Sequence, residues 1–184
     1  MIIGITGSIG SGKGEVSKIL ANKGFEIISF GDEARKEATI RGIEPTRENL
    51  QKLGIELSKI EGEDFVLNRI LSRIQKDKDY AIEGIRYLED LNILKKREDF
   101  ILIGIISSLE SRWQRVLNRD KEGDPITFDN FIKLDSIDNG SGNNTSGPDT
   151  LRCIEMADFI IVNDRSIKDI ENNVFMILKR LKDN

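Results

Sequence analysis

The sequence of 184 residues contains no histidine and a single cysteine, Cys153. Without histidine, the chain lacks the side chain that most often serves as a general base or metal ligand near neutral pH. One cysteine allows neither an intramolecular disulfide nor a cysteine-based metal cluster, and it fits a reducing compartment. Any chemistry must therefore be carried by carboxylates, lysines, arginines and the backbone.

Long apolar runs and a strong excess of one charge are also missing. No stretch approaches the roughly 20 apolar residues of a membrane-spanning helix, so we expect a soluble, cytoplasmic protein with no membrane partner. Twenty-eight basic and 32 acidic residues give a net charge of −4. This balance argues against a nucleic-acid partner. The length suits a single domain over residues 1–184, as a monomer or a small homo-oligomer.

Five short apolar runs alternate with segments of helical character. This alternation predicts a three-layer α/β/α fold with a five-stranded parallel sheet covered on both faces. In such sheets ligands bind beyond the carboxyl ends of the strands. The expected strands are Ile2–Thr6, Glu26–Phe30, Tyr80–Glu83, Phe100–Ser107 and Phe159–Asn163.

The segment that follows the first run, residues 7–14, reads Gly-Ser-Ile-Gly-Ser-Gly-Lys-Gly and precedes a helical pattern. Its glycines allow a turn that leaves backbone N–H groups free to surround a polyphosphate. The lysine supplies a mobile cation for the outer phosphates and is a candidate catalytic residue. This order of strand, loop and helix predicts an ATP site made of Gly7, Gly10, Ser11, Gly12, Lys13, Gly14 and Glu15.

Gly14 occupies the position at which a serine or threonine normally offers a hydroxyl to Mg²⁺. The end of the third strand then gains importance. We expect Glu83 to hold the metal ion through water. Beyond it, Gly84 allows a substrate to approach the backbone closely, and Arg86 can bind a phosphate in a bidentate manner.

The second strand is followed by Asp32 and Arg35, one helical turn apart. We expect Asp32 to orient or deprotonate the acceptor as a catalytic residue and Arg35 to bind the acceptor's phosphate. A capping role for Asp32 is an alternative that can coexist with this one. Further along, Arg112, Arg115 and Arg119 share one helix face and are candidates for stabilising charge on the transferred group, with Arg119 taken as the catalytic one. A solvated basic stripe is the alternative for at least one of them.

Two long connections complete the organisation. Residues 32–76 form a helical insertion on the acceptor side, interrupted near 42–46, which is either a small subdomain or a plain packing layer. Residues 120–150 form a lid-like or mobile region, in which 138–149 has no apolar anchor and is expected to be mobile. Arg152, just after this region, is expected to enter the substrate site when the loop closes. A final helix is predicted after the cap residue Ser166.

Parts of the sequence resemble known kinases. The segment Ile3 to Lys13, followed by Gly24 to Ile28, resembles the start of dephospho-CoA kinases, and Ala157 to Asn163 resembles a late strand of the same enzymes. In contrast, the segments around Asp32 and Arg86 resemble the acceptor-binding segments of adenylate kinases.

Over nearly its whole length, the chain is similar to the archaeal adenylate-kinase-related proteins, which are often labelled dephospho-CoA-kinase-like. This resemblance implies a P-loop NTPase core like that of nucleoside monophosphate kinases, ATP with Mg²⁺ as the donor, and a nucleotide-like acceptor. It also implies roles for Lys13, Asp32, Arg35 and Arg86. Gly14 and the segment 139–147 depart from the family pattern.

The residues and the resemblance together predict ATP-dependent phosphoryl transfer to a nucleotide-type small molecule. Dephospho-CoA is the alternative acceptor, which would make the protein a dephospho-CoA kinase. The alternatives of another class are a regulatory NTPase and a nucleotide-binding protein with weakened catalysis. The glycine at position 14 is the feature that favours weakened catalysis.

Overall fold

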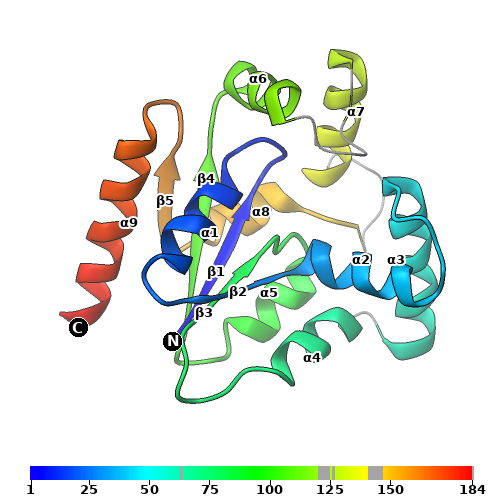
Figure 1. Ribbon diagram of the computed structural model, residues 1–184, viewed down its shortest axis with the longest axis horizontal. Coiled ribbons are helices and arrows are strands. Elements are labelled where there is room, and N and C mark those ends of the chain that lie inside the picture. The colour runs from blue at the N-terminus through cyan, green and yellow to red at the C-terminus, as the bar shows by residue number, and fades with distance from the viewer. Residues whose placement is uncertain (63, 120–124, 126, 141–146, 184) are drawn as a thin grey trace.

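The computed structural model describes residues 1–62, 64–119, 125, 127–140 and 147–183. Its five strands form one fully parallel sheet in the order β2-β3-β1-β4-β5 (Figure 1). The predicted parallel sheet is therefore confirmed, and the strand ends differ from the predicted ones by at most one residue. The strands are β1 (Ile2–Gly7), β2 (Glu26–Ser29), β3 (Tyr80–Glu83), β4 (Phe100–Ile106) and β5 (Phe159–Val162).

Both faces of the sheet are covered because the central strands are apolar on both sides. In β1, Ile3 and Ile5 pack under α1 (Lys13–Ala21) and α9 (Ile167–Lys182), whereas Ile2 faces the opposite layer. That layer consists of α4 (Phe65–Leu71), α5 (Leu88–Leu94) and α8 (Thr150–Glu155). Every residue of β1 is buried, and its isoleucines on both faces are what a strand covered on both sides requires.

Two helices begin at the polar cap residues that the sequence indicates. Ser166 caps α9 in a reciprocal capping box with Asp169, as expected from the serine before the apolar pattern. Thr46 accepts a hydrogen bond from the backbone N–H of Asn49 and caps α3 (Arg47–Glu61). The predicted interruption between two helices in the 32–76 insertion is therefore present.

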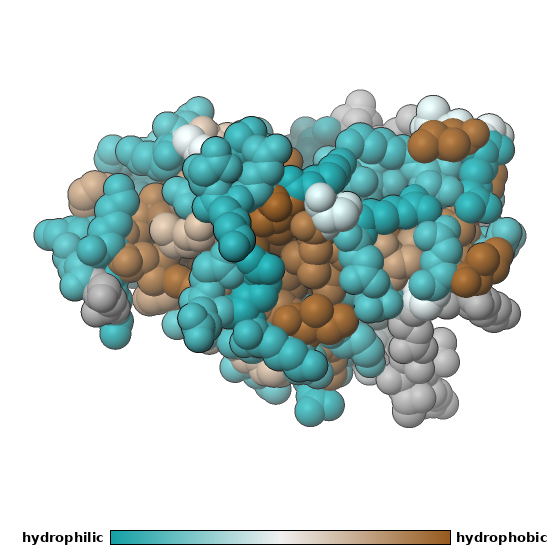
Figure 2. All heavy atoms as spheres, turned by 90° about the horizontal axis from the view of Figure 1, so that it is seen from below, coloured by the Kyte–Doolittle hydropathy of each residue, from teal (hydrophilic) through white to brown (hydrophobic). Residues whose placement is uncertain are grey.

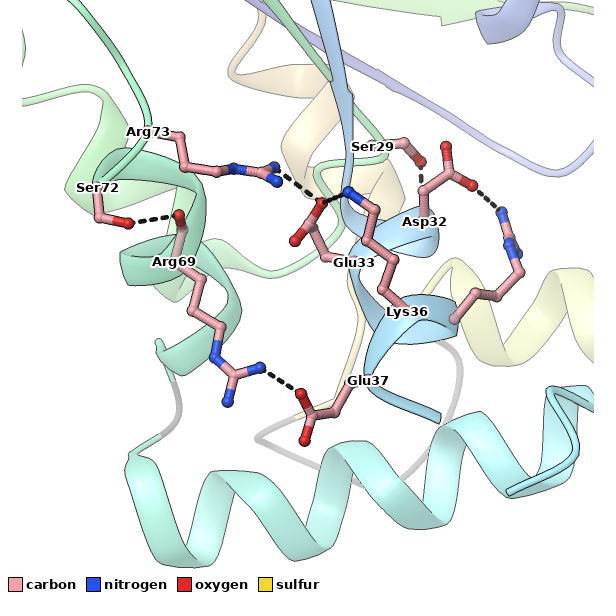
Figure 3. Close-up of polar contacts among 9 residues, drawn as sticks. Ser29, Asp32, Glu33, Lys36, Glu37, Arg69, Ser72 and Arg73 are labelled. Atoms are coloured by element: carbon pink, nitrogen blue, oxygen red, sulfur yellow. Dashed lines mark hydrogen bonds and ion pairs between the residues drawn. The ribbon is translucent and has the colours of Figure 1, made fainter. Parts of the chain in front are cut away.

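The insertion has a small core of its own. Helices α2 (Phe30–Ile40), α3 and α4 contribute Ala38, Leu53, Leu57 and Phe65 to one buried cluster. Ion pairs join α2 to the α4 segment: Glu37 binds Arg69 at 2.6 Å, and Glu33 binds Arg73 at 2.8 Å (Figure 3). In Figure 1, α2 and α3 lie at the opposite side of the molecule from α9.

The region after β4 contains more helix than the sequence indicated. Helix α6 (Leu109–Arg119) matches the prediction, but α7 (Phe128–Asp138) lies inside the region expected to be lid-like or mobile. Asp138, expected at the start of a mobile segment, is instead the buried last residue of α7. Asn139 and Asp149 form an antiparallel bridge that closes the segment between them, and residues 141–146 of this segment lie outside the described residues.

The surface at the amino ends of the strands has an apolar centre and a polar rim. Figure 2 shows this side, where polar and charged side chains surround apolar residues gathered near the middle. Among the helices of the described residues, none is long and apolar enough to cross a bilayer.

Candidate active site

The segments singled out in the sequence meet at one edge of the sheet. Because all five strands are parallel, the residues that follow β1, β2 and β3 emerge at the same side. The phosphate loop, residues 7–14, follows β1 at the centre of the sheet, next to the segment 84–86 that follows β3. The expected donor and acceptor segments are therefore neighbours.

The glycines of the phosphate loop are required by close packing as well as by backbone conformation. Gly10 and Gly12 have φ angles of 75° and 102°, which L-residues with a side chain rarely adopt. A Cβ atom on Gly10 would lie 2.4 Å from the carbonyl oxygen of Arg112, and one on Gly12 would lie 2.1 Å from the Asn163 Nδ2 atom. The loop is thus pressed against α6 and against the residue that follows β5.

Two arginines and one asparagine bind the carbonyl groups of this loop. Asn163 donates to Ser11 O at 2.8 Å, Arg115 donates to Gly10 O at 3.3 Å, and Arg112 donates to Ile9 O at 3.1 Å. Both arginines were expected from the sequence among the groups facing the transferred phosphate, whereas the structure shows them supporting the loop. Asn163 was assigned no role, because a residue 152 positions from its partner has no local signal.

Arg112 is also half of a buried ion pair. Its guanidinium binds both carboxylate oxygens of Asp135 on α7, at 2.5 and 2.8 Å. The same two helices share an apolar cluster in which Ile9 of the phosphate loop packs with Val116 and Phe131. Helix α7 therefore packs against the phosphate loop.

Lys13 is held over the loop by two of its carbonyls. The ammonium group donates to Gly7 O at 2.6 Å and to Ser8 O at 3.0 Å. Burial, together with the nearby Arg86 guanidinium, lowers the pKa of Lys13 to about 7. Lys13 is also the first residue of α1, whose leading N–H groups have no partner within the helix and favour a bound anion.

The missing hydroxyl at Gly14 has a counterpart one turn later. Ser17 donates to a carboxylate oxygen of Glu83 at 2.6 Å, so Glu83 is tied to α1 directly beneath the phosphate loop. A Cβ atom on Gly14 would meet nothing within 4 Å. In the part of the chain that is described, no three His, Cys, Asp or Glu side chains converge on a metal site. These residues fit a Mg²⁺ ion held by phosphate oxygens and water, with Glu83 binding the water.

Arg86 lies at the point where the segment 138–149 returns to the site. Its guanidinium donates to Asp138 Oδ2 at 3.0 Å, and its carbonyl accepts the N–H of Asp149 at 2.8 Å. The hydroxyl of Ser8 in the phosphate loop donates to Asn139 at 2.9 Å. Asp138 was missed as a site residue because the polar composition around it predicted a mobile loop.

Asp32 lies at the start of α2, as Figure 3 shows. It pairs with Arg35 at 2.7 Å, and its side chain is 62% exposed. The cap of α2 is Ser29, which accepts the N–H of Asp32, so the alternative capping role of Asp32 is wrong. Asp32 also lines a shallow groove of about 500 Å³ along the outer edge of β2.

Three further candidate residues lie around these groups, and their roles stay predictions. Gly84 has a φ angle of 92°, which explains the glycine on conformational grounds. Arg119 is one of the charges that lower the pKa of Lys13, so it faces the donor side. Arg152 lies exposed on α8, three residues after the Asp149 that contacts Arg86.

Sequence relatives cover the whole chain. A UPF0200 protein of Hyperthermus butylicus is 33% identical over 98% of this chain and 95% of its own length. A UPF0200 protein of Methanocaldococcus jannaschii is 33% identical over 100% of this chain and 92% of its own length. The family model described as an AAA domain matches residues 6–130.

Solved structures with this fold include small-molecule kinases. A shikimate kinase from Acinetobacter baumannii has a TM-score of 0.60 at 20% identity, covering 100% of this chain and 93% of its own. A dephospho-CoA kinase from Campylobacter jejuni has a TM-score of 0.54 at 19% identity, covering 97% and 96%. These likenesses confirm the three-layer P-loop kinase fold, while the specific relation to adenylate or dephospho-CoA kinases stays a prediction.

Proposed function

This chain belongs to the UPF0200 family, with an AAA domain of the P-loop kinase-like kind, and we propose that it transfers the γ-phosphoryl group of ATP to a small nucleotide-type acceptor. The observation that carries the proposal is the pair of cations Lys13 and Arg86. They follow the neighbouring strands β1 and β3, which meet where the Gly84 N–H donates to Ile5 O at 3.0 Å, and Arg86 contributes to the lowered pKa of Lys13. One cation serves the donor phosphates, and the other serves the acceptor side.

Phosphoryl transfer needs positioned charge more than covalent participation by the protein. In our proposal, the phosphate loop and the start of α1 bind the donor, and the Lys13 ammonium turns from the Gly7 and Ser8 carbonyls to the outer phosphates. Arg119 adds positive charge on the donor side. A bound Mg²⁺ ion would neutralise charge on the donor phosphates, with Glu83 holding its water.

The acceptor side is proposed to consist of Asp32, Arg35, Gly84, Arg86 and Arg152. Kinases of similar fold are named for hydroxyl-bearing acceptors, shikimate and dephospho-CoA. Dephospho-CoA is therefore kept as the alternative acceptor to a nucleoside monophosphate. A metabolite with a nucleotide portion fits both assignments.

The test is transfer from radiolabelled ATP with Mg²⁺ to nucleoside monophosphates, nucleosides, dephospho-CoA and shikimate. We expect one of these to be labelled at a rate well above ATP hydrolysis. Lys13→Ala should lower transfer by two orders of magnitude or more, by analogy with the loss of a single charge-stabilising donor of about 10²–10³-fold.

Lys18→Ala is the matched control, because Lys18 lies on the same helix, is exposed and, within the described part of the chain, pairs with Glu15 of its own helix at 2.8 Å. It should behave like the parent protein. Binding of MgADP without transfer to any acceptor would contradict the kinase assignment. Hydrolysis that needs no acceptor would instead support the NTPase class.

A further inference from the structure

We propose that Asp138 accepts the proton of the acceptor's attacking group, so that the acceptor is phosphorylated on a hydroxyl and not on a phosphate. This inference rests on the kinase function proposed above and narrows its substrate class. It follows from where α7 ends, from what surrounds Asp138, and from the position of the competing carboxylate Asp32.

Helix α7 is anchored so that its last turn faces the transfer site. Phe131 is fully buried against Ile9, and Asp135 is fixed by both arms of Arg112. Asp138 comes three residues after Asp135, and residues at this spacing share a helix face. Since Asp135 points to the phosphate loop, Asp138 points to the same side of the molecule.

The carboxylate of Asp138 is held in place at the acceptor side. Its side chain is only 10% exposed, and one oxygen accepts a hydrogen bond from Arg86 at 3.0 Å. The next residue, Asn139, accepts the hydroxyl of Ser8 from the phosphate loop. The carboxylate is also close enough to Lys13 to act on its pKa. A group able to accept a proton thus lies beside Arg86 and in the vicinity of the donor cation.

This charge pattern selects for a hydroxyl. A phosphate acceptor would bring up to two negative charges beside Asp138, and Glu83 is a second carboxylate facing the same cations. Like charges at short range in a partly buried site repel strongly. A hydroxyl acceptor is favoured beside Asp138, because it can donate a hydrogen bond to the carboxylate. Hydrogen bonds to a charged group are stronger than those between neutral groups.

Asp32 is less suited to this task in the structure. Its side chain is 62% exposed, its carboxylate pairs with Arg35 of its own helix, and it lines the groove at the outer edge of β2. Asp138, by contrast, is buried and directly bonded to the segment that follows β3. The two carboxylates therefore have separable roles.

The step is balanced without any further reactant. The acceptor oxygen forms a bond to the γ-phosphorus as its O–H proton passes to the Asp138 carboxylate. The bond from the γ-phosphorus to the bridging oxygen breaks, and ADP leaves with the electron pair. The products are a phosphomonoester, ADP and a proton that Asp138 releases to water.

The first test needs no variant. The product formed by the parent protein from ATP and the best acceptor among nucleosides, nucleoside monophosphates, dephospho-CoA and shikimate is analysed by ³¹P NMR. A new phosphomonoester resonance supports the inference. A new phosphorus–phosphorus coupling in the product made from the acceptor, separated from the ADP that every transfer releases, overturns it and leaves the kinase function standing. Absence of transfer to every acceptor, with MgADP still bound, overturns both.

The second test compares Asp138→Asn with Asp32→Asn and with Asp129→Asn, an exposed control on the same helix. We expect Asp138→Asn to lower kcat by about 10²–10⁴-fold, the usual contribution of a general base, with little change in acceptor KM. Asp32→Asn should affect kcat far less, and Asp129→Asn should have no effect. MgADP affinity and the melting temperature show that the variants are folded. A folded Asp138→Asn variant with the parent kcat would overturn the assignment.

Discussion

Ser17 on α1 donates a hydrogen bond to Glu83 at the end of β3 across 2.6 Å. The bond joins the helix that follows the phosphate loop to the strand beside it, and both groups lie under the site. It leaves Glu83 oriented by a neutral hydroxyl. In the function proposed above, the carboxyl group oriented in this way binds a water of the Mg²⁺ ion.

Removal of this hydroxyl should weaken both the fold and the use of Mg²⁺. Ser17→Ala should lower the free energy of unfolding by about 1.5–3 kcal/mol, the range for a hydrogen bond to a charged group. It should also raise the Mg²⁺ concentration needed for half-maximal transfer. Urea unfolding and Mg²⁺ titration measure the two effects. Ser72→Ala serves as the control, because the Ser72 hydroxyl binds only a carbonyl in its own helix turn.

Gly14 should tolerate a side chain that its neighbour Gly12 cannot. Gly14→Ser has open space around the new Cβ atom and restores a hydroxyl beside the donor phosphates, so Mg²⁺-dependent turnover should be preserved or increased. Gly12→Ser places its Cβ atom 2.1 Å from Asn163 and at an unfavourable φ angle, so it should abolish MgADP binding. Transfer assays at varied Mg²⁺ concentration measure the effect of Gly14→Ser, and calorimetric titration with MgADP measures that of Gly12→Ser. A large loss of turnover in the Gly14→Ser variant would show that the glycine is needed for another reason.

The lowered pKa of Lys13 should make nucleotide binding dependent on pH. Its pKa is about 7 in the protein against 10.5 for an ordinary lysine, and a bound triphosphate restores the charged form. Binding should therefore take up a proton above pH 7, and affinity should fall as the pH rises from 7. Titration calorimetry in buffers of different ionisation enthalpy detects this uptake. Lys13→Met should remove it; an unchanged proton uptake would assign the titration to another group.

The same lowered pKa affects stability in the opposite direction. Between pH 7 and 10.5 the folded protein binds fewer protons at Lys13 than the unfolded chain does, so this group's contribution to stability rises with pH in that window. Below pH 7 the buried charge carries its full cost. Unfolding of the parent and Lys13→Met proteins at pH 6 and 9 should show the difference, with the variant gaining most at pH 6.

Asp90 should also make the stability of the protein depend on pH, independently of the candidate site. Burial raises the pKa of this α5 carboxyl from 3.8 to about 7. The stability it provides is fully present below pH 4 and is lost as the pH rises towards 7, by about 1.4 kcal/mol per pH unit. Asp90→Asn should thus gain stability over the parent at pH 8 and little at pH 4, as measured by urea unfolding. Glu98→Gln, at an exposed position, should show no such difference.

The fold, and the order of strand, glycine-rich loop and helix around Lys13, were predictable because their signals are local. The apolar runs, the glycine spacing of the phosphate loop and the cap residues Thr46 and Ser166 each act within a few residues of the chain. The sheet direction followed from alternation with helices. Leu117 belongs to the apolar pattern of α6 but is 45% exposed, because the periodicity does not show which face of the helix a neighbour will cover.

By itself, the sequence determined a P-loop kinase-like α/β domain with a phosphate loop built around Lys13. Only the tertiary structure decided what surrounds that loop: Ser17 with Glu83, Asn163 with Ser11, and Asp138 with Arg86, which are 66, 152 and 52 residues apart. Periodicity and turn chemistry report interactions between near neighbours. Partners this distant are chosen by how the helices pack on the sheet, and the return of α7 to the phosphate loop is the clearest case.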